Sequence, residues 1–276
     1  KRMPEGPEIR RAADEIAQVL EGKITQKVSF SQPAMRRHGR RFSGHEVLEI
    51  ETRGKAMLTH FDHGWTIYSH NQLYGVWAVY PLGRIAKTNR SLRLRLTTAT
   101  HEALLYSASD ISIWPTRDID EHPFLARIGP DILSRSLDWR GVAERLGHPD
   151  FARRQLGALY LDQSFIAGLG NYLRAEILFD ARLHPALRPA DLSRGELGRL
   201  ARSTLELSLR SYKTGGITNT PSRARKLAAA GATFGQRRFA VFGREALGCY
   251  QCGQAVKRQE MNSRRIYLCT TCQPPA

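Results

Sequence analysis

Four cysteines near the C-terminal end of the chain have the spacing of metal ligands. Cys249 and Cys252 form one Cys-x-x-Cys pair, Cys269 and Cys272 form a second, and sixteen residues separate the pairs. Two such pairs can present four thiolates tetrahedrally to one Zn²⁺ while the segment between them closes as a β-hairpin. Two disulfides are disfavoured in an intracellular setting, and four inert thiols need no paired spacing. Because four cysteines leave no open coordination position, we expect one structural zinc ion that does not activate water.

The start of the chain brings a second group of reactive types together. Pro4, Glu5 and Glu8 stand in MPEGPEIRRAADEI, immediately ahead of a helical pattern. Proline in a first helical turn with acidic residues beside it is an ordinary helix start. Carboxylates placed in this way can also move protons in catalysis. The residues alone leave both interpretations open.

The charge of the chain points to a polyanionic partner. Lys and Arg number 42 against 26 Asp and Glu, which gives a net charge of +16. Nucleic acid is the first candidate and an anionic membrane surface the second. Residues 210–265 hold twelve basic and two acidic side chains, more than solubility requires. We find neither an apolar run of about 20 residues nor a secretory signal, so we expect a cytoplasmic protein.

Hydrophobic periodicity divides the chain near Pro123. Residues 7–20 have helical spacing, and a series of short β-type runs follows, at residues 23–30, 46–54, 55–61, 65–70, 76–80, 91–98 and 103–110. Alternation in VLEIE and LRLRL predicts strands with one wet face, hence an antiparallel sandwich or barrel. Beyond Pro123 the period becomes helical, and residues 213–232 have the composition of a mobile connection.

Three separated stretches, together with the four cysteines, carry a resemblance to a known family. PEGPEIRRAAD, ETRGKAMLTHF with YSHNQLYGVW, and DQSFIAGLGNYLRAEIL occur in that order. The chain, from Pro4 to Cys272, resembles the bacterial endonuclease VIII branch of the formamidopyrimidine-DNA glycosylase family. The resemblance implies a multi-domain α+β fold. Its parts are an N-terminal antiparallel β-sandwich with flanking helices (1–125), a helical domain with a helix-two-turns-helix motif (126–232) and a C-terminal β-hairpin zinc finger (233–276).

The same resemblance implies a bifunctional DNA glycosylase and abasic-site lyase of base-excision repair. Its substrates would be oxidised pyrimidines or abasic sites in double-stranded DNA, and cleavage would proceed by β,δ-elimination. Pro4 would be the nucleophile through its free secondary amine, Glu5 the proton-transferring acid, and Glu8 a supporting residue in the pocket. Since an amide nitrogen cannot form the iminium, we expect the functional chain to begin at Pro4, without Lys1, Arg2 and Met3.

The resemblance assigns roles to further residues only through their positions in the stretches that match the family. Lys55 would contact the phosphate beside the lesion, and Arg264, five residues before Cys269, would grip phosphates for the δ-step, with Arg265 as competitor. Their ordinary role is that of surface cations. The remaining DNA contacts would come from a void-filling wedge, a domain-junction arginine and a helix start with free N–H groups for phosphate: Gln72, Leu73, Tyr74, Arg127 and Asn171.

Two alternatives remain open at this point. The chain could belong to the branch that excises formamidopyrimidine and 8-oxoguanine, although the QLY triplet favours the pyrimidine branch. It could also be a non-catalytic zinc-ribbon DNA-binding protein, since charge, finger and helical motif would support that equally. We expect a monomer.

Overall fold

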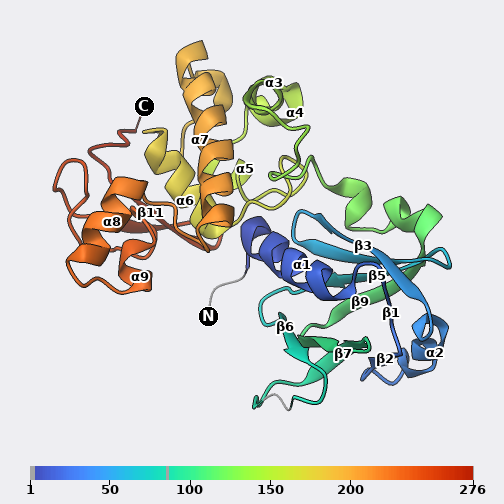
Figure 1. Cartoon of the computed structure of the whole chain (residues 1–276). Coiled ribbons are helices and arrows are strands. Elements are labelled where there is room, and N and C mark those ends of the chain that lie inside the picture. The colour runs from blue at the N-terminus through green and yellow to red at the C-terminus, as the bar shows by residue number, and fades with distance from the viewer. Residues whose placement is uncertain (1–3, 85–86, 276) are drawn as a thin grey trace. The chain divides into compact units, whose positions relative to one another are not determined.

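The computed structural model describes residues 4–84 and 87–275 (Figure 1). The expectation that the functional chain begins at Pro4 concerns Lys1, Arg2 and Met3. These three residues lie outside the described residues. Two compact units emerge from the contacts within the chain: unit 1 includes Pro4 and Glu8–Arg127, and unit 2 includes Glu5–Pro7 and the chain from Ile128 onward. The finer division into three domains stays a prediction.

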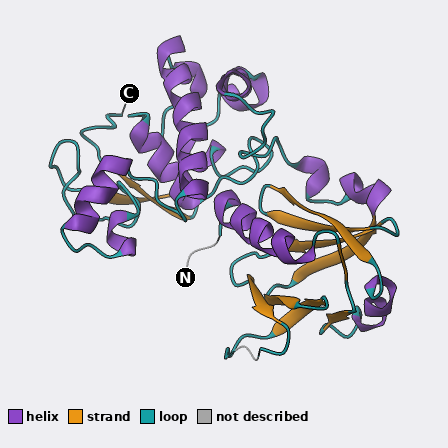
Figure 2. Ribbon diagram, in the orientation of Figure 1, coloured by secondary structure: helices purple, strands orange, loops and turns teal. Residues whose placement is uncertain are grey.

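The β-rich part of the chain consists of two antiparallel sheets, drawn as orange arrows in Figure 2. One has the strand order β1-β3-β4-β5-β9, the other β2-β7-β8-β6. The elements are α1 (Gly6–Leu20), β1 (Lys23–Ile24), β2 (Lys27–Phe30), α2 (Gly39–Phe42), β3 (Glu46–Arg53), β4 (Ala56–Phe61), β5 (Trp65–His70), β6 (Val76–Pro81), β7 (Leu92–Thr97), β8 (His101–Tyr106) and β9 (Asp110–Pro115).

A single hydrophobic core joins both sheets to α1. Ile9 and Ile16 of α1 are 1% exposed, as expected for one apolar stripe at helical spacing. They pack in one cluster with residues of both sheets, among them Ile67 and Leu94. The alternation in LRLRL buries Leu94 and Leu96 completely. The prediction of an antiparallel sandwich with flanking helices is therefore confirmed.

Two details of the strand prediction were wrong. The run 23–30 is not one strand, because the chain changes sheets at Thr25, whose buried hydroxyl donates hydrogen bonds to the carbonyls of Phe42 (2.7 Å) and His45 (3.0 Å). The run 103–110 ends at Tyr106, and β9, which pairs with β5, had not been predicted as a separate strand. Alternation alone signals neither event, since both depend on contacts distant in sequence.

The second part of the chain is mainly helical and ends in a two-stranded hairpin. Its elements are α3 (Trp139–Gly147), α4 (Pro149–Ala152), α5 (Leu156–Leu159), α6 (Asn171–Asp180), α7 (Arg194–Lys213), α8 (Pro221–Ala229), α9 (Phe234–Arg237), β10 (Lys257–Met261) and β11 (Arg264–Leu268). Helix α6 is buried along almost its whole length at the centre of the core. Among the described residues, no helix has the length and apolar character needed to cross a bilayer.

The expected mobile connection at residues 213–232 contains a helix, α8. Thr220 accepts a hydrogen bond from the backbone N–H of Arg223 (3.3 Å) and so caps the helix, and Pro221 occupies its first turn. The Gly and Thr residues that suggested a loop flank the helix, and Ser222 lies in its first turn. The prediction failed because composition was averaged over a cap, a helix and a loop.

Candidate active site and metal centre

The carboxylate of Glu5 is buried against the beginning of helix α6. Glu5 is 3% exposed and accepts hydrogen bonds from the backbone N–H groups of Tyr172 (2.8 Å) and Leu173 (3.3 Å). The free N–H groups of a first helical turn favour such an anionic partner. Those two groups had been expected to bind phosphate, and in this structure the chain's own carboxylate occupies them. Glu5 is therefore held in a fixed position directly after Pro4, which is half-buried.

Two glycines allow this close approach. A Cβ added to Gly170 would lie 2.4 Å from Cδ of Glu5, and one added to Gly6 would lie 3.0 Å from Cα of Gly168. The backbone N–H of Gly6 donates to the carbonyl of Gly168 at 2.8 Å. Gly168 has φ of +99°, a conformation that favours glycine. The turn before α6 thus has to be glycine-rich for Glu5 to reach the helix.

A buried arginine, which the sequence analysis missed, connects this helix to the hairpin. Arg174 is fully buried and donates to the side-chain oxygen of Asn171 (2.6 Å) and to the carbonyls of Gly157 (2.9 Å) and Arg265 (3.1 Å). Asn171 also donates through Nδ2 to the carbonyl of Arg265 (2.9 Å). These bonds fix β11 against α6.

The charges of Glu5 and Arg264 both influence Arg174. Burial lowers the pKa of Arg174 to about 10; the negative charge of Glu5 raises it and the positive charge of Arg264 lowers it. Both side chains therefore act on the same buried guanidinium. Arg264 and Arg265 follow one another in β11 opposite Met261 and Glu260, so their side chains point to opposite faces of the hairpin. The structure thus brings Glu5, Asn171 and Arg264 together around Arg174.

Lys55 lies in unit 1, in the tight turn between β3 and β4. Arg53 pairs with Ala56 across this turn, and Gly54 has φ of +64°. Lys55 is 9% exposed, so the interpretation as an ordinary surface lysine at a strand end is wrong. Burial lowers the pKa of nearby His70, the charge of Asp110 raises it, and the charge of Lys55 lowers it further. The side chain of Lys55 therefore has a defined position beside His70 and does not extend freely into solvent.

The predicted wedge residues form the loop between β5 and β6. Leu73 is 40% and Tyr74 59% exposed, so neither belongs to the core, which had been the alternative. Gln72 has a left-handed backbone, with φ of +50°, and its side-chain oxygen accepts a hydrogen bond from Ser109 at 2.8 Å. The loop therefore presents two apolar side chains to solvent beside an amide that is held in place.

The remaining predicted residues are placed as follows. Arg127 is exposed at the end of unit 1, where its Nε donates to the carbonyl of Pro123 at 2.8 Å. Glu8 lies in the first turn of α1 and is partly exposed. Arg127, Glu8 and Lys55 belong to unit 1, whereas Glu5, Asn171 and Arg264 belong to unit 2.

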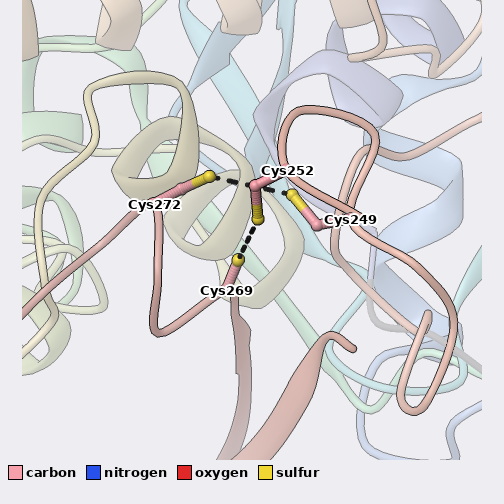
Figure 3. A group of neighbouring side chains, drawn as sticks. All are labelled: Cys249, Cys252, Cys269 and Cys272. Atoms are coloured by element: carbon pink, nitrogen blue, oxygen red, sulfur yellow. Dashed lines mark hydrogen bonds between the residues drawn. The ribbon is translucent and has the colours of Figure 1, made fainter. Parts of the chain in front are cut away.

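The four cysteine side chains converge on one point (Figure 3). Their sulfur atoms all lie within 4.8 Å of one another, with Cys249 and Cys272 3.9 Å apart and Cys252 and Cys269 3.4 Å apart. A tetrahedral site with metal–sulfur bonds of about 2.3 Å places neighbouring sulfurs about 3.8 Å apart. All four cysteines are free thiols, so the disulfide alternative is wrong. The cluster fits one metal ion at the base of the β10–β11 hairpin.

Comparisons with known proteins agree with this architecture. Residues 3–109 match the model of the formamidopyrimidine-DNA glycosylase N-terminal domain, and residues 128–222 match that of the formamidopyrimidine-DNA glycosylase H2TH domain. The chain is 46% identical over 271 residues to an Endonuclease 8 of Pectobacterium atrosepticum and 45% identical to one of Escherichia coli. Each match covers 98% of this chain and 100% of the relative.

Solved structures show the same fold. Lactococcus lactis Fpg (MutM) in complex with DNA containing N7-benzyl-Fapy-dG superposes with a TM-score of 0.81 at 20% identity, and covers 99% of this chain and 100% of that one. The Lactococcus lactis Fpg complex with DNA containing an abasic site has a TM-score of 0.80.

A β-sandwich followed by an H2TH domain and a four-cysteine hairpin defines a DNA glycosylase of base-excision repair that is also an abasic-site lyase. The chain belongs to the formamidopyrimidine-DNA glycosylase family. This assignment favours the enzyme over the non-catalytic zinc-ribbon alternative.

Proposed function

We propose that this enzyme excises oxidised pyrimidines from double-stranded DNA and cuts the strand by β,δ-elimination. Relatives at 44–46% identity carry the name Endonuclease 8, which supports this branch of the family. The observation that carries the proposal is the position of Glu5. Its buried carboxylate is fixed on the first turn of α6, one peptide bond from Pro4.

Pro4 acts as the nucleophile in this proposal. An α-amine has a pKa near 8, against about 10.4 for lysine, so near neutral pH much more of it is unprotonated. Its nitrogen bonds to deoxyribose C1′ as the base leaves with the electrons of the glycosidic bond. The proline nitrogen loses its proton, Glu5 protonates O4′, and the C1′–O4′ bond breaks, which opens the sugar ring and leaves the iminium cation that accepts electrons during elimination. The chemistry requires Pro4 to be the first residue of the functional chain.

The other residues bind and orient the DNA. Lys55 contacts the phosphate beside the lesion and assists β-elimination, and Arg264 holds the phosphates for the δ-step. Leu73 and Tyr74 fill the space left by the flipped nucleotide, and Gln72 probes the opposite base. Arg127 and Asn171 contact the phosphate backbone of the DNA. Glu8 supports the pocket that contains Pro4 and Glu5.

We propose zinc as the metal of the cysteine cluster, held by Cys249, Cys252, Cys269 and Cys272. Four thiolates suit zinc, which would fold the hairpin and orient Arg264. The enzyme binds damaged duplex DNA as a monomer. It acts where the chromosome lies, in the bacterial cytoplasm, and is nucleoid-associated while it is bound.

Borohydride trapping tests the proposal. Protein that starts at Pro4 is mixed with a duplex containing an abasic site, and borohydride reduces any imine to a stable protein–DNA adduct. We expect an adduct whose peptide map places the DNA on Pro4. Pro4→Gly should slow excision severely and leave DNA affinity largely unchanged. Absence of an adduct, or unchanged turnover of Pro4→Gly, would contradict the assignment.

The second candidate is excision of formamidopyrimidine or 8-oxoguanine. The two matching family models carry the name formamidopyrimidine-DNA glycosylase, which supports this candidate. Cleavage of duplexes containing thymine glycol or 8-oxoguanine separates the candidates, and we expect faster cleavage of the thymine-glycol duplex.

A further inference from the structure

A second cluster of side chains of the types that bind metals lies in unit 1, at the opposite end of β3 from Lys55. His45 immediately precedes β3, and Asp62 and His63 form the turn between β4 and β5. Strand β3 has eight residues, so at about 3.3 Å per residue His45 and Lys55 lie roughly 30 Å apart. The cluster therefore lies far from Lys55, and it shares no residue with the cysteine site.

The donor atoms of this cluster are close together. Nδ1 of His45 lies 2.8 Å and Nδ1 of His63 3.7 Å from Oδ1 of Asp62. One ligand atom from each residue lies within 4.8 Å of the other two. Adjacent ligands on a metal with bonds of 2.0–2.2 Å lie about 3 to 3.5 Å apart. The observed separations bracket that range.

His63 supplies an independent sign of a missing ligand. Its side chain is 17% exposed, and both ring nitrogens are buried without a hydrogen-bond partner. Phe42 and Phe61 pack edge-on against the ring at centroid distances of 5.3 and 5.8 Å, and offer no lone pair to it. A buried unsatisfied polar group costs about 1–3 kcal/mol. Coordination through Nδ1 would satisfy the acceptor nitrogen.

We propose that His45, Asp62 and His63 form a second metal site, for a divalent first-row transition ion. Two imidazoles and one carboxylate with open positions form a donor set that such ions accept. The bound ion would join the start of β3 to the β4–β5 turn and so stabilise unit 1.

Two features limit the affinity. The rings of His45 and His63 are stacked at 4.0 Å with planes 18° apart, so one ring must rotate before both lone pairs meet a single ion. His45, whose side chain is 38% exposed, would exchange its 2.8 Å hydrogen bond with Asp62 for the ion as its ring turns. Arg41, whose guanidinium lies 4.0 Å from the Trp65 ring centroid, adds a positive charge near His63, which the carboxylate of Asp62 offsets.

Nickel provides a probe that elemental analysis distinguishes from zinc. The zinc-loaded protein, without an affinity tag, is dialysed against Ni²⁺, and both elements are counted per chain. We expect one nickel to bind while the zinc of the cysteine cluster is retained, and the melting temperature to rise. In His63→Gln and Asp62→Asn we expect the affinity for nickel to fall by about tenfold or more.

His148→Gln serves as the matched control. His148 also lies near a carboxylate, with its Nδ1 3.5 Å from Asp150, but that pair has no second histidine, and this variant should bind nickel as the wild type does. If His63→Gln fails to fold, the Asp62→Asn variant decides, because its side chain is 42% exposed. The proposal is overturned if the wild type binds no nickel, or if Asp62→Asn binds it as tightly as the wild type.

Discussion

The position of the Glu5 carboxylate depends on the absence of a side chain at Gly170. An added Cβ would lie 2.4 Å from Cδ of Glu5, so Gly170→Ala must displace the carboxylate from the N–H groups of Tyr172 and Leu173. We expect base excision to slow by about a hundredfold, the range for loss of a positioned acid. Single-turnover cleavage of a lesion duplex measures this rate.

Gly147→Ala is the matched control, because an added Cβ there meets no atom within 4 Å. It should cleave at the wild-type rate. Wild-type cleavage by Gly170→Ala would show that the position of Glu5 on α6 is not needed.

Arg264 and Arg265 can be separated by the salt dependence of binding. Loss of one phosphate contact reduces the slope of log K against log salt by about 0.9. Because Arg264 lies on the side of the hairpin that influences Arg174, we expect this reduction for Arg264→Gln and a smaller one for Arg265→Gln. Fluorescence anisotropy with an abasic duplex at several salt concentrations provides the slopes, and a larger change for Arg265→Gln would reverse the assignment.

The site residues differ in how far the sequence could predict them. The cysteines follow from spacing alone, because two Cys-x-x-Cys pairs have few uses. Glu5 and Lys55 required the resemblance, since each is a common residue in a common local setting. Arg174 could not have been found, because an arginine within NYLRAEIL has the pattern of a surface residue. Its complete burial arises only when α6 packs between α5 and the hairpin.

At the scale of elements, the loop between β5 and β6 offers a test of base flipping. Leu73→Ala combined with Tyr74→Ala removes the exposed apolar surface of the loop without touching the core. We expect excision of a damaged base to slow by about tenfold or more, because nothing then fills the vacated stack. Cleavage at a preformed abasic site should change less. Parallel kinetics on the two substrates measure the difference.

Leu48→Ala is the control for this variant, since Leu48 is an exposed side chain, 56% accessible, on strand β3. It should leave both rates unchanged. An equal loss on the two substrates for the loop variant would contradict a function in base flipping.

A charged network between strands β3 and β4 predicts how stability depends on pH. Burial raises the pKa of Glu51, but hydrogen bonds from His60 (2.9 Å) and Arg53 (2.6 Å) lower it from 4.5 to about 2. As pH falls, the unfolded chain therefore takes up this proton first. The stabilisation is complete above pH 4.5 and is lost between pH 4.5 and 2.

Glu51→Gln should accordingly lower the free energy of unfolding by roughly 2 kcal/mol at pH 7, with a smaller difference near pH 3. Urea unfolding of both proteins at the two pH values tests this. A difference that grows as the pH falls would have the wrong sign for this network.

The helices and strands were largely predictable where one hydrophobic period continues along the sequence. Helix α1 and strands β3 and β7 follow their hydrophobic patterns because each presents one face to a common core, whereas β4 is an apolar run buried on both faces. The division of 23–30 between two sheets is fixed by Thr25 and its partners far along the chain. Helix α8 is short, and its local signals, Thr220 and Pro221, are also typical of loops.

At the scale of the whole molecule, the metal proposed for the cysteine cluster would support more than the finger. Cys249, Val256 and Ile266 of the finger are part of the same hydrophobic core as α6 and α7. Chelation should therefore loosen β11, whose Arg265 carbonyl binds Asn171 and Arg174. We expect a loss of roughly 3 kcal/mol or more, or about 10 °C in Tm, and weaker DNA binding. Calorimetry with and without a chelator measures the loss of stability. Added zinc should restore both the stability and the DNA affinity. Metal-free protein with full DNA affinity would contradict this dependence.

The left-handed backbone of Gln72 is costly for a residue with a side chain, and glycine or asparagine would adopt it more easily. A library selected only for survival of heating should therefore enrich Gly or Asn at position 72. The same library selected for survival of oxidative damage should retain Gln. The two selections would diverge at this codon because stability favours glycine or asparagine there, whereas the proposed contact with the opposite base favours glutamine.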